Sequence, residues 1–181
     1  MHLASLPPEV DELLHQLGAP PRLVAHLTLV HDVSCLLTAR LDAMWPTLTY
    51  DRRAVRQGAA LHDIGKIVHR AELTHPGHAH EVAGEELLRA HGFPDALARF
   101  ARTHRQWVDD PAPQPEDLLV ALADTWWRGK RDDDLEAAVC RWVATQTQAA
   151  QWEVFAAMDD LAADITAEAD ACLAWQQQFA A

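Results

Sequence analysis

The feature of this sequence that most limits its fold is an apolar pattern with the period of an α-helix along nearly the whole chain. Residues three, four and seven positions apart share one face of a helix. The segment 21–43 places five apolar residues along one stripe, namely Leu23, Leu27, Val30, Leu37 and Leu41. β-Branched residues never form an alternating run, and only seven glycines interrupt the 181 residues. The pattern predicts an all-α fold, a helical bundle that forms a single domain over residues 1–181.

Prolines, glycines and capping residues set the predicted helix boundaries. A short helix ends near Gly18, and two prolines open the helix over 21–43. Asp51 can cap a third helix that runs to about Ile64, where Gly65 fits a C-terminal cap. The rest of the chain predicts a proline-rich loop over 108–115 and helices over about 78–91, 95–107, 116–128, from 132, and from 151 to the end. No glycine or proline marks the hinge between the last two helices.

The charge balance restricts the class of ligand. The chain has 27 acidic and 15 basic residues, which gives a formal net charge of −12. An acidic surface repels phosphate backbones and anionic headgroups. We therefore expect no general nucleic-acid binding and no membrane partner, and no apolar stretch approaches the ~20 residues of a membrane span.

The cysteines indicate the compartment. Cys35, Cys140 and Cys172 are far apart, and no C-x-x-C pair is present. Neither a disulfide framework nor a thiolate zinc site is indicated. With no visible signal peptide, the expected location is cytoplasmic.

The histidines are the candidate functional residues, since the chain has 11 of them and histidine is the commonest metal ligand. Four fall on the apolar faces of predicted helices, where they are joined by two aspartates. The six inward-facing residues are His26, His62, Asp63, His80, His104 and Asp124. The other seven histidines have the pattern of surface, loop or terminal residues.

Burial of these six groups without partners would cost several kcal/mol for each unpaired charge. A bound divalent ion removes that cost, because it coordinates neutral imidazole and ionised carboxylate. Nitrogen and oxygen ligands without cysteine suit Fe, Mn, Co, Ni, Zn or Mg. Gly58 and Gly84 lie on the same helix faces, where close packing around a site, or an ordinary helix crossing, would explain them.

The order of these residues resembles the H…HD…D signature of the HD-domain metal-dependent phosphohydrolases. Leu61 to Lys66 reads L-H-D-I-G-K, the fullest form of the motif. The segment 80–88 resembles the H-E-x-x-G-x-x-x-L segment of the family, and Thr103-His104 and Ala123-Asp124 match its later motifs. The resemblance covers the motif-bearing core at about 20–130, while the C-terminal helices at about 131–181 carry no recognised motif.

The resemblance implies an all-α bundle of the HD-domain type and a binuclear metal site. His26, His62, Asp63 and Asp124 would bind the first ion, Asp63 would bridge, and His80 and His104 would hold the second. The pattern is similar to that of small bacterial dinucleoside-tetraphosphate hydrolases of this class. It lacks the literal G-Y-P motif of the cyclic-di-GMP phosphodiesterases.

The implied activity is hydrolysis of a phosphate ester or anhydride by metal-activated hydroxide. Asp63 and Lys66 are the expected catalytic residues, with Lys66 and Arg105 as contacts for an anionic substrate. A surface lysine near a helix C-terminus and a surface arginine paired with an acid are the alternatives. The expected substrate is a small phosphorylated molecule, with a nucleotide favoured, because a local positive pocket suffices to bind it on an acidic surface.

Two other functions share the same six residues. Mixed-valent di-iron oxygenases of the HD fold use the same ligand order, and a non-catalytic HD domain that binds a nucleotide is a third alternative. Seven tryptophans, five of them after residue 125, favour core packing of the last helices. A base-stacking wall or a homodimer surface is the alternative interpretation.

Overall fold

The computed structural model describes residues 3–108, 110 and 112–180. Within these ranges the chain forms helices and no β-strand, so the all-α prediction is confirmed. The elements are α1 (Pro8–Gln16), α2 (Pro21–Met44), α3 (Arg52–Leu61), η1 (Ile64–Ile67), η2 (Arg70–Leu73), α4 (Ala79–Ala90), α5 (Asp95–Ala98), α6 (Phe100–Thr103), η3 (Gln106–Val108), α7 (Pro115–Trp126), α8 (Asp133–Thr147), α9 (Gln151–Thr166) and α10 (Ala169–Gln176), where η denotes a 3₁₀ helix.

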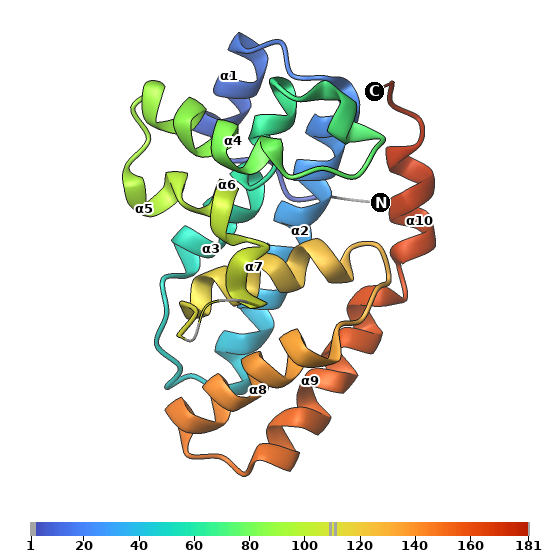
Figure 1. Cartoon of the computed structure of the whole chain (residues 1–181). Helices are drawn as coiled ribbons and strands as arrows, with labels where there is room; N and C mark the ends of the chain where they lie inside the picture. Colours follow the sequence, from blue (N-terminus) through green and yellow to red (C-terminus); the bar gives the residue numbers. More distant parts are fainter. Residues whose placement is uncertain (1–2, 109, 111, 181) are drawn as a thin grey trace.

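The long helix α2 forms the axis of the bundle (Figure 1). It packs against α3, α7 and α10, while α4 packs against η1 and α6. Figure 1 shows α1, α4 and α5 towards one end of α2, and α8 and α9 paired at the other. No helix in the described part of the chain is both long enough and apolar enough to cross a bilayer.

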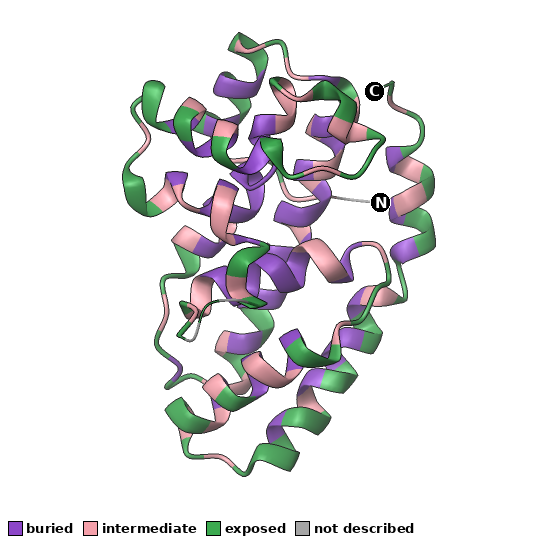
Figure 2. Cartoon of the chain, viewed as in Figure 1, coloured by how far each residue is buried: buried purple, intermediate pink, exposed green. Residues whose placement is uncertain are grey.

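Two apolar clusters hold the bundle together, and buried residues line the inner faces of the helices in both (Figure 2). One cluster contains Leu23 and Leu27 from the start of α2, together with α1 and the end of α3. The other contains the later part of α2, α7, α8 and α9, with Trp126 fully buried. The helices α2, α3 and α7 therefore have a fixed rotation, because each buries one apolar face.

The predicted end of the third helix is wrong by one turn. Asp51 caps α3 as expected, accepting a hydrogen bond from the Ala54 amide at 2.9 Å, but α3 ends at Leu61 and not at Ile64. Gly65 lies inside the 3₁₀ helix η1 and not at a C-terminal cap. Its backbone is not left-handed. A Cβ at Gly65 would lie 1.9 Å from the carbonyl oxygen of His80, so glycine is needed there for close packing against α4.

The predicted helix over 95–107 is divided into α5, α6 and η3. The hydroxyl of Thr103 donates to the carbonyl of Arg99, and the His104 ring bonds to the carbonyl of Phe100. Side chains that bond to the preceding backbone turn compete with continuation of the helix. Of the predicted loop over 108–115, residues 109 and 111 lie outside the described part.

The C-terminal segment also differs from the prediction of one helix from 151 to the end, because α9 stops at Thr166 and α10 begins at Ala169. The unmarked hinge before α9 is made by Gln148, whose left-handed backbone (φ 57°) ends α8 without a glycine. The prediction that the C-terminal tryptophans pack in the core is confirmed for Trp126 and wrong for Trp152, which is 72% exposed. The buried face of α9 instead carries Val154, Met158, Leu161, Ala162 and Ile165.

Candidate metal centre

The six predicted donor residues converge from five helical segments. His26 lies in the second turn of α2, His62 and Asp63 directly follow α3, and His80 is the second residue of α4. His104 directly follows α6, and Asp124 lies in the last turn of α7. Their donor atoms form two groups of three, His26 with His62 and Asp124, and Asp63 with His80 and His104. In each group the atoms lie within 4.8 Å of one another.

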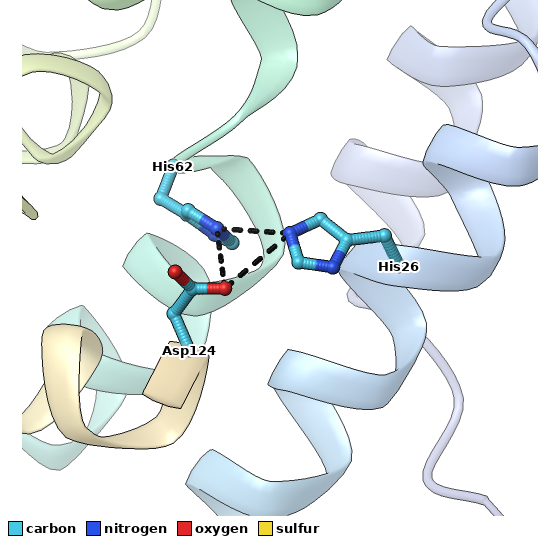
Figure 3. Close-up of side chains that lie close together, drawn as sticks. All are labelled: His26, His62 and Asp124. Carbon is cyan, nitrogen blue, oxygen red and sulfur yellow. Dashed lines mark hydrogen bonds and ion pairs between the residues drawn. The ribbon is translucent and has the colours of Figure 1, made fainter. Parts of the chain in front are cut away.

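The first group is compact (Figure 3). His26 Nε2 lies 3.2 Å from His62 Nε2 and 3.5 Å from Asp124 Oδ1, and His62 Nε2 lies 3.6 Å from the same oxygen. The Oδ2 atom of Asp63 completes this group, at 3.0 Å from His26 Nε2 and 3.7 Å from His62 Nε2. Four donors from α2, the end of α3 and α7 therefore point at one position.

Asp63 also belongs to the second group through its other oxygen. Its Oδ1 atom lies 3.1 Å from His80 Nε2 and 3.9 Å from His104 Nε2. The two oxygens of one carboxylate thus face the two groups separately. This arrangement allows Asp63 to bridge two ions.

Hydrogen bonds to the far nitrogen orient three of the four imidazoles. His62 Nδ1 lies 2.9 Å from the Ala59 carbonyl oxygen, and His104 Nδ1 lies 3.1 Å from the Phe100 carbonyl oxygen. His80 Nδ1 bonds to the carboxylate of Glu72. A carbonyl or carboxylate accepts only from N–H, so each ring carries its proton on Nδ1 and presents a lone pair on Nε2. The sequence alone does not indicate this role for Glu72, which lies between the predicted helices that end near Ile64 and begin near residue 78.

These residues fit a metal ion, as one buried atom shows directly. His80 Nε2 is buried without a hydrogen-bond partner, although Asp63 Oδ1 is near, because the two atoms are not aligned for a hydrogen bond. Donors bonded to one ion at ~2.1 Å lie roughly 3.0–3.4 Å apart, close to the 3.0–3.7 Å found in the first group. The donor set, four imidazoles and two carboxylates, suits divalent transition metals and Mg²⁺.

Burial and mutual interaction shift the pKa values of the donors in opposite directions. Burial, reinforced by the neighbouring His62, lowers the pKa of His104 to about 3, so its ring is neutral near pH 7. Burial alone would raise the pKa of Asp63, but His62, His26 and His80 outweigh it and lower that pKa well below its usual range. Asp63 is therefore ionised, which is the form that binds a cation.

A close contact between two glycines brings members of the second donor group together. A Cβ at Gly84 would lie 2.9 Å from Ala101 Cβ and 3.1 Å from the Gly65 amide nitrogen. With Gly65 itself against the His80 carbonyl, η1 and α4 approach at backbone distance. This contact brings His80 next to Asp63. Gly58 packs against the Phe100 ring, so both glycines noted in the sequence serve close packing near the site.

The two predicted substrate contacts line different cavities. The ammonium of Lys66 forms an ion pair with Asp63 Oδ2. Lys66 lines a cavity of about 260 Å³ next to His26, here called the His26 cavity. Arg105 is exposed and lines a second cavity of about 240 Å³ next to His104 and Asp124, here called the His104 cavity. Arg128, which the sequence reasoning did not select, lines both cavities.

The fold and the donor set define an all-α protein with two adjoining groups of side chains that could hold divalent metal ions. The family model for the HD domain matches residues 23–126, more than half of the chain. The chain therefore belongs to the HD domain family, whose members are generally metal-dependent hydrolases. The resemblance in the motifs is thus confirmed at the level of the family.

Part of the chain is similar to a curated protein. Ribonuclease Y of Aquifex aeolicus (strain VF5) is 37% identical over 97 residues, which make up 52% of this chain and 16% of that protein. The chain therefore spans about a sixth of the length of this relative. No solved structure matches the chain.

Proposed function

We propose that this protein is a metal-dependent phosphohydrolase that cleaves a phosphate ester or anhydride in a small phosphorylated substrate, a nucleotide in particular. The observation that carries the proposal is the converging set of six buried or half-buried donors around the two oxygens of Asp63. Membership of the HD domain family supports hydrolysis as the reaction.

The six donors would hold two divalent ions, His26, His62 and Asp124 on one side and His80 and His104 on the other, with Asp63 between. Such ions supply a bound water with its pKa lowered to about 7 and neutralise charge on phosphoryl oxygens. Asp63 keeps the two groups at a fixed separation, because its oxygens face opposite sides. The Lys66 ammonium, next to Asp63, is positioned to bind a phosphoryl oxygen at the edge of the His26 cavity.

The volumes of the two cavities and the net charge of the protein support a small substrate. The cavities on the two sides of the donors have volumes of about 260 and 240 Å³, below the ~300–1,000 Å³ of sites for drug-sized molecules. The net charge of −12 disfavours long polyanions. The name of the relative Ribonuclease Y indicates RNA as the substrate of that protein, so a short oligoribonucleotide is the proper comparison substrate.

The test is phosphate release from a panel of nucleotides and a short oligoribonucleotide with Mn, Co, Ni, Mg or Fe. Asp63→Ala should abolish turnover. The matched control is Asp164→Ala, which removes an exposed carboxylate paired with Arg40 far along the chain from the donors. Absence of any hydrolysis that requires both a metal and Asp63 would contradict the proposal.

The same preparation distinguishes the oxygenase alternative. Oxygen uptake by the iron-loaded protein with a polyol or phosphonate, without phosphatase turnover, would replace the proposed function with C–C or C–P cleavage. Ligand binding that survives in the Asp63→Ala protein, with no turnover by the wild-type protein, would favour a nucleotide sensor.

A further inference from the structure

The two cavities that flank the metal centre meet at one residue. The His26 cavity is lined by His26 and Lys66, and the His104 cavity by His104 and Asp124. Arg128 contributes to the lining of both. Because donor residues line both cavities, a molecule that reacts at the centre can extend into both.

The His26 cavity is lined by basic residues, although the protein as a whole is acidic. Three of the residues that line it are basic, Arg22, Lys66 and Arg128, and no Asp or Glu is among the described residues of the lining. The chain as a whole has a net charge of −12. A local concentration of cations on an acidic surface is suited to bind one small anion.

The walls of the same cavity are suited to a flat apolar group. Leu23, Leu73 and Leu173 line it together with Trp127. The Trp127 indole is held in place, because its Nε1–H donates to Asp124 Oδ1 at 3.3 Å and its ring packs edge-on against His26. A fixed aromatic wall with an adjacent amide, Gln176, matches the mixed character of a nucleoside.

Arg128 has donors that the protein leaves unused. Its Nε atom is buried and has no hydrogen-bond partner. Its Nη2 atom lies 4.0 Å from Asp124 Oδ2, beyond hydrogen-bond distance. An unpaired buried donor is costly unless a ligand satisfies it, and the guanidinium fork fits two oxygens of one phosphate.

Arg131, which lines the His104 cavity as well, provides the contrast. It bonds to both carboxylate oxygens of Glu136, at 2.7 and 2.6 Å, and to Asp159 at 2.8 Å. Its donors are therefore occupied by the fold. The free cationic groups on the side of the His104 cavity are those of Arg105 and Lys130, for which the described structure shows no ion pair.

We propose that Arg128 binds the reacting region of a two-armed substrate, a nucleoside phosphoanhydride or phosphodiester with one arm in each cavity. The nucleoside lies in the His26 cavity against Trp127, and the second, anionic arm lies in the His104 cavity beside Arg105 and Lys130. This proposal rests on the proposed function. In the reaction, water forms a new P–O bond, the bond from phosphorus to the oxygen of one arm breaks, and that oxygen takes up a proton.

The test is calorimetric titration of the metal-loaded protein with the β,γ-methylene analogue of ATP, which has two arms and is not cleaved at that bridge. The one-armed comparison is AMP. We expect the two-armed analogue to bind at least tenfold more tightly than AMP. Arg128→Met should remove most of this difference, and Arg128→Lys should restore part of it, since lysine keeps the charge but lacks the fork.

The control is Arg141→Met, which makes the same change at an exposed position of α8. It should bind the analogue as the wild-type protein does. Circular dichroism and the melting temperature of Arg128→Met should match the wild-type values, which separates lost binding from lost folding. A second readout is quenching of tryptophan fluorescence by the analogue, which should be weaker in Trp127→Phe.

Equal binding of the analogue to Arg128→Met and wild-type protein would overturn the inference, whether or not nucleotides are hydrolysed. Equal affinities of the wild-type protein for AMP and the analogue would also overturn it. Tighter binding of a short oligoribonucleotide than of the analogue would replace the small substrate with RNA. A protein that binds the analogue through Arg128 but hydrolyses nothing would contradict the proposed function alone.

Discussion

The carboxylate of Glu72 accepts hydrogen bonds from the Nδ1 atom of His80 and from the backbone N–H groups of Ala79 and His80. Both of its oxygens are used, and all three partners are donors. The Glu72 side chain therefore fixes the His80 tautomer and also satisfies free amides at the start of α4. Gly77 permits this approach, because a Cβ there would lie 2.4 Å from the Glu72 carboxyl carbon.

Glu72→Gln should weaken the second metal site. A glutamine amide must turn its NH₂ group either to the Ala79 amide or to His80 Nδ1, and both are donors. If the NH₂ group faces His80 Nδ1, the proton of the His80 ring moves to Nε2, and Nε2 then has no lone pair to offer a metal ion. Loss of such an orienting partner costs about 10–100-fold in metal affinity, which titration with Co²⁺ or Mn²⁺ measures.

The matched control is Glu85→Gln, the same change at a buried position of α4. Glu85 pairs with Arg89 and Arg102 and contacts no donor residue in these interactions. The Glu85→Gln protein should bind two ions per chain with the affinity of the wild-type protein. Retention of two tightly bound ions by Glu72→Gln would show that His80 needs no orienting carboxylate.

Gly65→Ala should destabilise the fold more than Gly84→Ala. A Cβ at Gly65 would meet backbone atoms, the carbonyl oxygen of His80 at 1.9 Å, whereas a Cβ at Gly84 meets a side-chain methyl at 2.9 Å. Overpacking of this kind lowers the free energy of unfolding by about 1–3 kcal/mol. We expect Gly65→Ala at the upper end of this range, because backbone atoms can move aside less easily than a side chain. Urea unfolding of both variants measures the difference, and equal midpoints would contradict the close approach of η1 and α4.

The metal-free protein should lose stability as the pH falls from 6.5 to 4, and His104 should account for part of the loss. Its folded pKa of about 3 lies below the ordinary value of 6.5, with burial as the main cause. Below pH 6.5 the unfolded chain takes up a proton that the folded protein rejects. The free energy of unfolding therefore falls by about 1.4 kcal/mol per pH unit for this group.

His104→Gln isolates that contribution, because glutamine does not titrate. Urea unfolding at pH 6.5, 5.5 and 4.5 should give a shallower slope for the variant than for the wild-type protein. The neighbouring carboxylates raise the pKa values of His62 and His80 against the effect of burial, so these two residues act in the opposite direction to His104. Both are present in the wild-type protein and in the variant, so the difference between the two slopes reports on His104. Parallel slopes in the two proteins would contradict a neutral His104.

The sequence predicted the convergence of the six donors better than it predicted the elements that carry them. His62 and His104 were expected inside helices, but each directly follows the end of one. Their directions were still right, because the last turn of a helix fixes the phase of the residue that follows it. The HD motif therefore identifies a helix end at which the chain turns towards α4.

The features that the sequence did not reveal depend on contacts between distant segments. Gly65 has the pattern of a helix cap, and only its approach to the His80 carbonyl shows why glycine is there. Arg128 belongs to no sequence motif. Only the structure shows that it lines both cavities and that its Nε atom has no hydrogen-bond partner. Gln148 ends α8 with a left-handed backbone that residue type does not predict.

Metal removal should lower the melting temperature, and replacement of both carboxylates should abolish this dependence. A ligand that binds only the folded state stabilises it by about 2.7 kcal/mol at a concentration 100 times its dissociation constant. In Asp63→Asn/Asp124→Asn the donors lose both charges, so chelator and added metal should leave the melting temperature unchanged. The control is Asp164→Asn, which removes an exposed charge and should keep the full metal-dependent shift. If chelation left the wild-type melting temperature unchanged, the buried donors would not be held together by a metal.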